Sequence, residues 1–415
     1  MFVDTAQINA DNRGIIVIRE EDFVRDVVIV SAKRTAIGAF GGVFKDVTAV
    51  ELGTQVVKSA LEAIKLNPAE VNHLVFGNVY SAGLKGNLAR QVLIHAGIPE
   101  SATGESVNIL CGSGLKAVIN GAQTIMLGDN DVVVVGGAEN MTRAPYVMPN
   151  LRFGARMGNT QAIDTMLHDG LVDAFHDYHM GVTAENIAEQ HGFTRQQQDE
   201  LAAASQQRAE AAIKSGRFND EIAPVAVPQR RGEDLIIDQD EFPKFGTTVE
   251  DLSKLRPAFK KDGTVTAGNA SGINDGAAAL VLMSAEKAAE LNLEPLATIA
   301  AYGVGGVAPS IMGTGPIPAS QKALNKAGLK VEDIDLIESN EAFAAQALSV
   351  IEHFDFDREI VNVNGGAIAL GHPVGASGAR ILVSLLHEMK KRDSKTGLAT
   401  LCVGGGQGVA VLVKR

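Results

Sequence analysis

An internal repeat constrains the fold of this chain more than any other feature of its sequence. Residues 60–78 (ALEAIKLNPAEVNHLVFGN) resemble residues 323–340 (ALNKAGLKVEDIDLIESN), and both patterns are typical of a helix, a turn and a buried strand that ends in Asn. Downstream, Ser113-Gly114 begins an apolar-periodic helix before the strand DVVVVGG, and Ser377-Gly378 begins another before the strand ATLCVGGG. Because the elements follow in the same order, the sequence predicts two homologous halves.

The fold class follows from the alternation of helical patterns with short runs of Val, Leu and Ile. Such alternation predicts an α/β fold, with two mixed sheets buried between helices. A chain of 415 residues is too long for one simple core, so we expect two or three packed units.

The two halves differ at one glycine-rich stretch. In the second half, GGGQG runs directly into the strand VAVLV, as in a hairpin. In the first half, the matching Gly136-Gly137 precedes its candidate partner strand, Gly276 to Met283, by well over a hundred residues. We therefore predict an inserted domain at this end of the sheets, where a lid or a binding domain would lie.

Charge and hydropathy exclude several classes of protein. The formal net charge of -12 argues against a non-specific nucleic-acid binder, which needs clustered positive charge. No apolar run approaches the roughly 18 to 20 residues of a membrane helix. The first 25 residues lack a basic start followed by a long apolar run, so we expect no secretory signal and a cytoplasmic location. We expect the two cysteines, which lie far apart in sequence, to be reduced thiols.

Each of the two cysteines has both a catalytic and a structural interpretation. Cys111 directly precedes the helix that begins at Ser113, where helix N–H groups would stabilise a thiolate nucleophile. Cys402 ends a strand just before GGGQG. Either thiol could instead be a small buried hydrophobe, the usual state of a free cysteine.

Two further polar residues lie on loops that correspond in the repeat. His372, between Gly371 and Pro373, precedes the second half's helix as Cys111 precedes the first half's, and Asn340 ends a strand. Alternatively, the histidine is a satisfied structural imidazole and the asparagine a helix cap. Together, two thiols, an imidazole and an amide suit acyl transfer through a thioester, followed by proton abstraction beside a carbonyl.

Seven longer motifs in the sequence resemble those of one known protein family. The sequence resembles the thiolase family, most closely its short-chain biosynthetic acetyl-CoA acetyltransferases, from about Asp26 to the C-terminus. The resemblance is carried by the motifs VNILCGSGLKA, HMGVTAE, TAGNASGINDGAAA, MGTGPIPA, SNEAFAAQ, VNGGAIALGHPVGASGAR and LCVGGGQGVA.

The resemblance implies a five-layered αβαβα fold of two repeated halves with an inserted loop domain. We expect an N-terminal extension at residues 1–25, a first half at 26–141 completed by 274–295, a CoA-binding insert at 142–273, and a second half at 296–415.

The resemblance also implies the catalytic roles. Cys111 matches the nucleophile that takes the acyl group, and His372 matches the base that activates it. Cys402 matches the acid/base at the α-carbon of the second acyl-CoA. Asn340 matches the residue that holds a water, which forms one oxyanion hole with His372. The N–H groups of Cys111 and Gly404 match the second hole.

Substrate contacts are implied in the same way. One group of residues matches the lining of a small acyl and pantetheine pocket: His179, Met180, Met312 and Phe343. Ser271 matches a contact to the pantetheine chain, and Lys244 and Phe259 are weaker position matches, since the family often has Arg where Lys244 stands. A patch for the CoA phosphates could comprise Lys244 with Arg230, Arg231, Arg256 and Lys260, although scattered charges are usually solvated surface.

The expected reaction is the reversible condensation of two acetyl-CoA molecules to acetoacetyl-CoA and CoA. CoA is part of the substrate, and no cofactor or metal is expected. His168, His176 and His191 could suggest a metal, but no pattern places a third ligand beside His176 and His179. Alternatives are a degradative 3-ketoacyl-CoA thiolase of broader chain length and a non-catalytic CoA-binding subunit. Family resemblance further implies a homotetramer built as a dimer of dimers.

Overall fold

The first half of the molecule is a five-stranded mixed sheet with helices on both faces. The computed structural model describes residues 24–415, so most of the predicted N-terminal extension lies outside the described residues. The strands follow the order β1-β11-β5-β3-β4; β3 is parallel to β5 and β4, and the other pairs are antiparallel. The elements of this half are β1 (Val27–Thr35), β2 (Gly38–Ala39), α1 (Ala49–Ala63), β3 (His73–Gly77), α2 (Leu88–His95), β4 (Thr103–Val107), α3 (Ser113–Met126), β5 (Val132–Asn140), β11 (Asn274–Ser284) and α7 (Ala285–Glu290).

The second half repeats this plan, as the sequence predicts. Its strands follow the order β12-β15-β14-β13, in which β13 and β14 are parallel and the other neighbours antiparallel. The elements are β12 (Ala297–Gly306), α8 (Pro316–Ala327), β13 (Leu336–Ser339), α9 (Ala344–Phe354), α10 (Ala367–Leu370), α11 (Val374–Arg392), β14 (Thr396–Val403) and β15 (Gln407–Lys414). The turn Gly404–Gly406 joins β14 to β15 as the predicted hairpin.

The two sheets are joined rather than separate. β1 and β12, the corresponding first strands of the halves, pair through Val28 with Thr298 and Ile29 with Ala297. This short contact links both sheets into one hydrogen-bonded path. It covers edges that would otherwise expose unpaired backbone groups.

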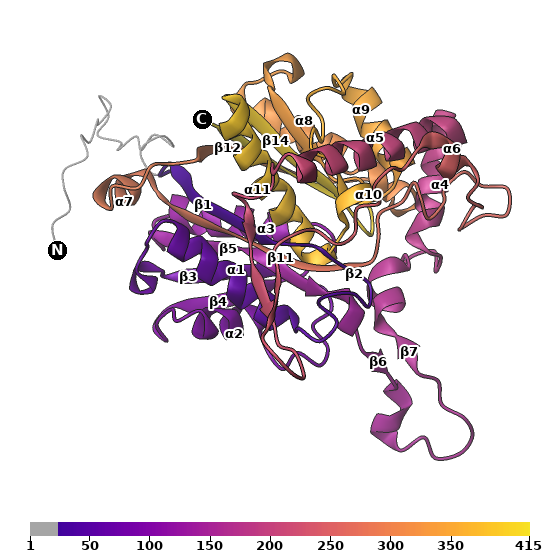
Figure 1. The fold of residues 1–415 in the computed structure, drawn as a ribbon, viewed down its shortest axis with the longest axis horizontal. Coiled ribbons are helices and arrows are strands. Elements are labelled where there is room, and N and C mark those ends of the chain that lie inside the picture. The colour runs from indigo at the N-terminus through magenta and orange to yellow at the C-terminus, as the bar shows by residue number, and fades with distance from the viewer. Residues whose placement is uncertain (1–23) are drawn as a thin grey trace, which may run out of the picture.

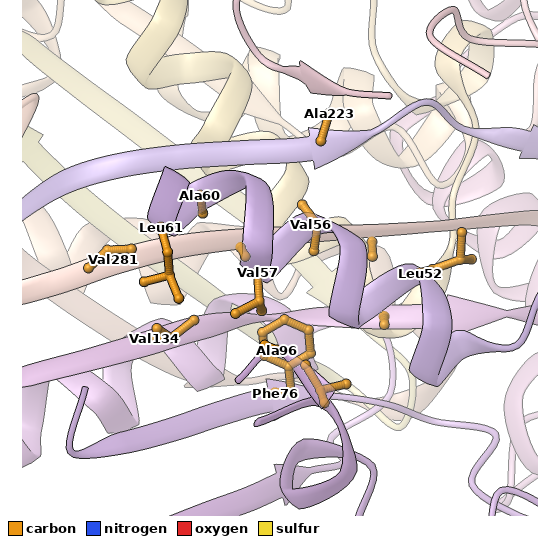
Figure 2. Packing of buried hydrophobic residues seen from close by; sticks show 14 of the residues in the cluster. Leu52, Val56, Val57, Ala60, Leu61, Phe76, Ala96, Val134, Ala223 and Val281 are labelled. Atoms are coloured by element: carbon orange, nitrogen blue, oxygen red, sulfur yellow. The ribbon is translucent and has the colours of Figure 1, made fainter. Parts of the chain in front are cut away.

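Five layers result from helices on both sides of each sheet (Figure 1). α1 lays Leu52, Val56 and Leu61 on the outer face of the first sheet, and Figure 2 shows Leu61 beside Val281 and Val134. Thr48 and Glu51 form a reciprocal capping box that fixes the start of α1. α8 and α9 cover the outer face of the second sheet. The central layer consists of α3 and α11, whose apolar faces are buried between the two sheets.

Residues between β5 and β11 form the long excursion that the sequence predicts. Gly136 and Gly137 lie inside β5, which continues to Asn140 before the chain leaves the sheet. The excursion returns at Asn274, the first residue of β11, and the next three residues, Asp275–Ala277, pair with residues 138–140 of β5. Its elements are β6 (Tyr146–Val147), β7 (Ile163–Asp164), α4 (Met180–His191), α5 (Arg195–Lys214), β8 (Ile222–Ala223), β9 (Val225–Val227), β10 (Leu235–Ile237) and α6 (Val249–Ser253).

A buried ion network ties this excursion to both halves. Arg34 of β1 has no exposed surface and donates to Glu221 at 2.6 Å and to Asp240 at 2.7 and 2.9 Å. Glu221 also accepts a hydrogen bond from Ser384 of α11 at 3.1 Å. Buried charges are tolerated only when paired in this way.

One arm of the excursion projects from the body, carrying β6 and β7 (Figure 1). It exposes large apolar side chains: Phe153 is 84% and Met157 98% exposed. Across residues 24–415, no helix combines the length and apolar character needed to cross a membrane.

Candidate active site

The first turns of α3 and α11 cross in backbone contact, and glycines make this possible. A Cβ on Gly114 would lie 2.8 Å from the amide nitrogen of Ala379, and a Cβ on Gly378 would overlap the backbone of Leu115. Real Cβ atoms essentially never approach other heavy atoms within 3.0 Å. The loops that precede the two helices are therefore held against one another.

Cys111 lies in the loop directly before α3, and this loop is strained. Leu110 has a φ of 57°, in the left-handed region that bulky residues rarely adopt. The Asn108 side chain accepts a hydrogen bond from the Leu110 N–H at 3.0 Å, and the Ser113 hydroxyl donates to the Leu110 carbonyl at 2.6 Å. Strain of this kind, fixed by surrounding groups, is common at functional sites.

Burial and hydrogen bonding have opposite effects on the pKa of the Cys111 thiol. Burial raises the pKa of the thiol to about 11, whereas hydrogen bonds from the N–H groups of Gly404 and of Cys111 itself act to lower it. The N-terminus of the following helix favours the thiolate, but desolvation favours the neutral thiol more strongly. The resting group is thus a thiol, with two N–H donors converging on it.

His372 is buried and held at two points. Its Nδ1 lies 2.6 Å from the Ser377 hydroxyl oxygen, and its backbone N–H donates to Asn274 Oδ1 at 2.9 Å. Burial lowers the pKa of the imidazole to about 3, so the ring is neutral at physiological pH. α11 begins at Val374, earlier than the predicted Ser377, because Pro373 supplies a φ of -67° that suits the residue before a helix.

Cys402 lies at the end of β14 with no exposed surface. Burial raises the pKa of its thiol, and the neighbouring Cys111 raises it further. The side chain packs in an apolar cluster with Met180, Met312 and Phe343. The second thiol therefore lies near the first and against the residues that match an acyl pocket.

Asn340 follows β13 and is completely buried. Its backbone N–H donates to the Thr400 carbonyl at 3.0 Å. Within residues 24–415, neither amide atom of its side chain nor Nε2 of His372 has a hydrogen-bond partner in the protein. Buried polar atoms are normally paired, so these three atoms are suited to hold a water or a substrate oxygen.

Glu139 is a buried residue of the site that the sequence analysis missed. Its carboxylate accepts hydrogen bonds from Val79 N and Asn78 Nδ2, both at 2.8 Å, and from Gly375 N of α11 at 3.0 Å. Burial raises the pKa of this carboxyl to about 7. A charged residue directly after the apolar run VVVVGGA is the signal that could have identified it, because such a residue needs buried partners.

The residues matched to the acyl pocket do come together. His179 stacks on Phe259 with ring centroids 4.6 Å apart, and Phe259 meets the edge of Phe343 at 6.0 Å. Met180 and Met312 are buried in the same cluster as Cys402. The wall beside Cys402 is thus closed by two methionines and an aromatic stack.

Ser271 and Lys244 lie on different parts of the excursion. Ser271 donates its N–H to the Ala342 carbonyl at 3.0 Å, so its segment docks on the loop after Asn340. Lys244 is exposed and lines a cavity of about 270 Å³ together with Phe242, Leu252, Gly268 and Ile368.

The other candidate cations lie on three segments of the excursion. Lys260 contacts Asn186 at 3.2 Å and Glu189 at 3.8 Å, both on α4. Arg230 and Arg231 lie in the turn between β9 and β10, and Arg256 follows α6. Their grouping into a patch for the CoA phosphates stays a prediction.

Two of the histidines considered as metal ligands, His179 and His176, make hydrogen bonds within the protein instead. His179 caps α4 by accepting the Gly181 N–H at 3.0 Å, and His176 pairs with Asp173 at 2.7 Å. Among residues 24–415, no cluster of three or more His, Cys, Asp or Glu side chains could hold a metal ion.

Comparison with known proteins identifies the family. The model of the thiolase N-terminal domain matches residues 27–286, and that of the thiolase C-terminal domain matches residues 293–415. The acetyl-CoA acetyltransferase of Pseudomonas aeruginosa is 58% identical over 392 residues, covering 94% of this chain and 100% of the relative. The Escherichia coli acetyl-CoA acetyltransferase is 56% identical over 393 residues, with the same coverage of both chains.

Solved structures agree. The Bacillus anthracis acetyl-CoA acetyltransferase superposes with a TM-score of 0.92 at 47% identity, and human mitochondrial 3-ketoacyl-CoA thiolase with 0.91 at 46%. Each comparison covers 94% of this chain and 99% of the other. The predicted fold is therefore confirmed, and this chain belongs to the thiolase family.

Proposed function

We propose that this thiolase condenses two molecules of acetyl-CoA reversibly to acetoacetyl-CoA and CoA, through an acetyl-Cys111 intermediate. The observation that carries the proposal is the placement of Cys111 and His372 on the loops before α3 and α11, two helices whose backbones touch, with the second thiol, Cys402, close to Cys111. The names of the P. aeruginosa and E. coli relatives support acetyl-CoA as the substrate.

In the first half-reaction, the Cys111 sulfur attacks the thioester carbonyl while His372 Nε2 takes the thiol proton. A neutral imidazole can accept this proton, and the pKa of His372 supports that state. The N–H groups of Cys111 and Gly404 converge on the sulfur and can stabilise the carbonyl oxygen as it becomes an anion. The bond from carbon to the CoA sulfur then breaks.

Cys402 acts as an acid at the end of the first half-reaction and as a base in the second. Its raised pKa makes it a thiol at rest, so it can protonate the departing CoA sulfur and become a thiolate, which completes the first half-reaction. In the second half-reaction this thiolate takes a proton from the α-carbon of the second acetyl-CoA. The carbanion attacks the acetyl carbonyl, and the released Cys111 sulfur recovers its proton from His372. Asn340 and His372 Nε2 hold the water that stabilises the enolate oxygen.

A degradative thiolase of broader chain length is the second candidate. The likeness to human mitochondrial 3-ketoacyl-CoA thiolase favours it. Met180 and Met312 favour a short acyl group instead, because both are buried against Cys402. Thiolysis of 3-ketoacyl-CoA substrates of increasing length decides between them: the short-chain proposal fails if palmitoyl-range substrates react as fast as acetoacetyl-CoA.

The decisive experiment is the intact mass of the protein after brief incubation with acetyl-CoA, followed by peptide mapping. We expect an acetyl adduct on Cys111 that disappears when CoA is added. The Cys111→Ala variant should form no adduct. The Cys402→Ala variant should still be acetylated, because a thiolate can leave unaided near neutral pH, but should not condense.

Two outcomes would change the proposal. Tight CoA binding without any adduct favours a non-catalytic CoA-binding subunit. Normal condensation by Cys402→Ala would refute the role of the second thiol.

CoA contacts and domain division belong to the same proposal. We assign residues 142–273 as the CoA-binding insert between a first half at 26–141, completed by 274–295, and a second half at 296–415. The docking of the Ser271 segment on residue 342 and the cavity beside Lys244 support this assignment. CoA enters as substrate, and the scheme above needs no cofactor.

Assembly as a homotetramer is supported by the projecting arm. Tyr146, Leu151, Phe153 and Met157 expose apolar surface there, which partner subunits would cover. A monomer by light scattering would refute the assignment. The cytoplasmic location stays a prediction.

A further inference from the structure

Corresponding serines lie in the first turns of both central helices. Ser113 Oγ donates to the Leu110 carbonyl at 2.6 Å and accepts the Ile109 N–H at 3.0 Å. Ser377 Oγ lies 2.9 Å from the Pro373 carbonyl and 2.6 Å from His372 Nδ1. Each hydroxyl thus joins its helix to the preceding loop, and in the second half one of its partners is the imidazole.

The Ser377 hydroxyl has one proton to donate, and its neighbours decide where that proton goes. The Pro373 carbonyl can only accept. If Ser377 donated to Nδ1 instead, two oxygens would face one another at 2.9 Å without a proton between them. Donation to the carbonyl therefore leaves the hydroxyl oxygen as the acceptor of an Nδ1–H group.

The other ring nitrogen is compatible with this arrangement. Nε2 of His372 is buried without a hydrogen-bond partner among the described residues. An unmatched buried nitrogen is disfavoured in either tautomer, so the contacts of Ser377 decide where the ring proton lies. With that proton on Nδ1, Nε2 carries a lone pair and is ready to accept.

We propose that Ser377 is a positioning residue that fixes neutral His372 as the Nδ1–H tautomer, so that Nε2 carries the lone pair that takes the Cys111 proton. The inference rests on the proposed function, because only a base on Nε2 gives the tautomer a catalytic consequence. Nucleophile, base and an orienting third group form a recurrent arrangement in covalent catalysis.

Three substitutions at this position separate orientation from packing. In Ser377→Ala, acetylation of Cys111 by acetyl-CoA should slow by about 100-fold, the lower end of what general acid–base catalysis contributes, with KM unchanged. Ser377→Thr keeps the hydroxyl and should restore much of the rate. Ser377→Cys fills the volume but is a weak acceptor, so it should remain slow.

The matched control is Ser384→Ala, on the same helix. Ser384 donates to Glu221 at 3.1 Å, away from the His372 loop, so its removal should leave the acetylation rate unchanged. Full activity of Ser377→Cys would overturn the inference, since volume alone would then suffice. If Ser377→Thr does not fold, the comparison of Ser377→Cys with wild type still decides.

The tautomer itself can be read without activity. In protein labelled with ¹⁵N-histidine, with the His372 signals assigned by their loss in His372→Gln, we expect the proton on Nδ1 in the wild type and a shift toward Nε2 in Ser377→Ala. A wild-type proton on Nε2 overturns the inference, whereas acetyl-Cys111 formation would still uphold the proposed function. An Nδ1 proton without any acetylation would refute the proposed function alone.

Discussion

The contact between α3 and α11 can be tested by adding one methyl group. In Gly114→Ala, the new Cβ would lie 2.8 Å from the amide nitrogen of Ala379 and 3.0 Å from the carbonyl oxygen of Gly375. Ordinary contact begins at 3.4 Å, so restoring it requires the two helices to separate by about 0.6 Å. Both neighbours are backbone atoms and cannot rotate away.

This separation should affect stability and rate together. Overpacking of a close contact costs about 1–3 kcal/mol, partly offset by up to about 1 kcal/mol of helix propensity that alanine gains over glycine. Because a misplacement near 1 Å can cost about 100-fold, we expect kcat to fall between about 10- and 100-fold. KM for acetyl-CoA should change little, since most of the proposed substrate contacts lie on the insert, away from Gly114.

The assay combines urea unfolding with steady-state kinetics, using Gly86→Ala as the control. Gly86 has open space around its Cβ position and no positive φ, so this substitution should leave both quantities unchanged. If Gly114→Ala matched wild type in stability and kcat, the helices would not be held in backbone contact, and the explanation of how the two loops are brought together would be wrong.

Two other predictions use the ion network and the resting thiol. Arg34→Met should lower the free energy of unfolding by about 3–5 kcal/mol, because it leaves Glu221 and Asp240 buried without their cation. The control Lys395→Met removes one partner of an exposed ion pair and should cost less than about 1 kcal/mol. Equal losses in urea unfolding would contradict the reasoning. The rate of Cys111 alkylation by iodoacetamide should rise about tenfold per pH unit between pH 6 and 9. The reason is that the pKa of the thiol is raised to about 11, so the thiolate fraction is still growing in this range. A plateau of the rate by pH 8 would instead indicate a thiolate at rest.

Much of the fold could be predicted because its signals are local. The repeat, the alternation of helical and apolar patterns, and the hairpin at GGGQG each depend on neighbours in sequence, and the structure confirms all three. The sequence predicts two sheets but does not show that they join, because the pairing of β1 with β12 depends on how the halves meet. The start of α11 was misplaced because Pro373 outweighs the serine signal at residue 377.

The candidate site divides in the same way. The residues named from motifs lie in or beside loops whose composition is unusual, such as Cys111 at the start of CGSG and His372 between glycine and proline. Asn274 and Glu139 are not identified from the sequence, because the groups that they bind lie in a distant part of the chain. Asn274 accepts the backbone N–H of His372 in the loop before α11, and Glu139 accepts that of Gly375 in α11. The pKa of the Cys111 thiol likewise depends on the assembled fold, because burial raises it.

The sequence by itself determined the order of elements, the twofold repeat and the identity of the polar groups that carry chemistry, because these follow from periodicity and residue type. Only the tertiary structure decided which of those groups meet and in what state. It sets helices against one another at Gly114 and Gly378, fixes Ser377 beside the imidazole, and buries Cys402 completely and Cys111 in part. Distance, orientation and desolvation arise when residues far apart in the chain pack together, and no local pattern encodes them.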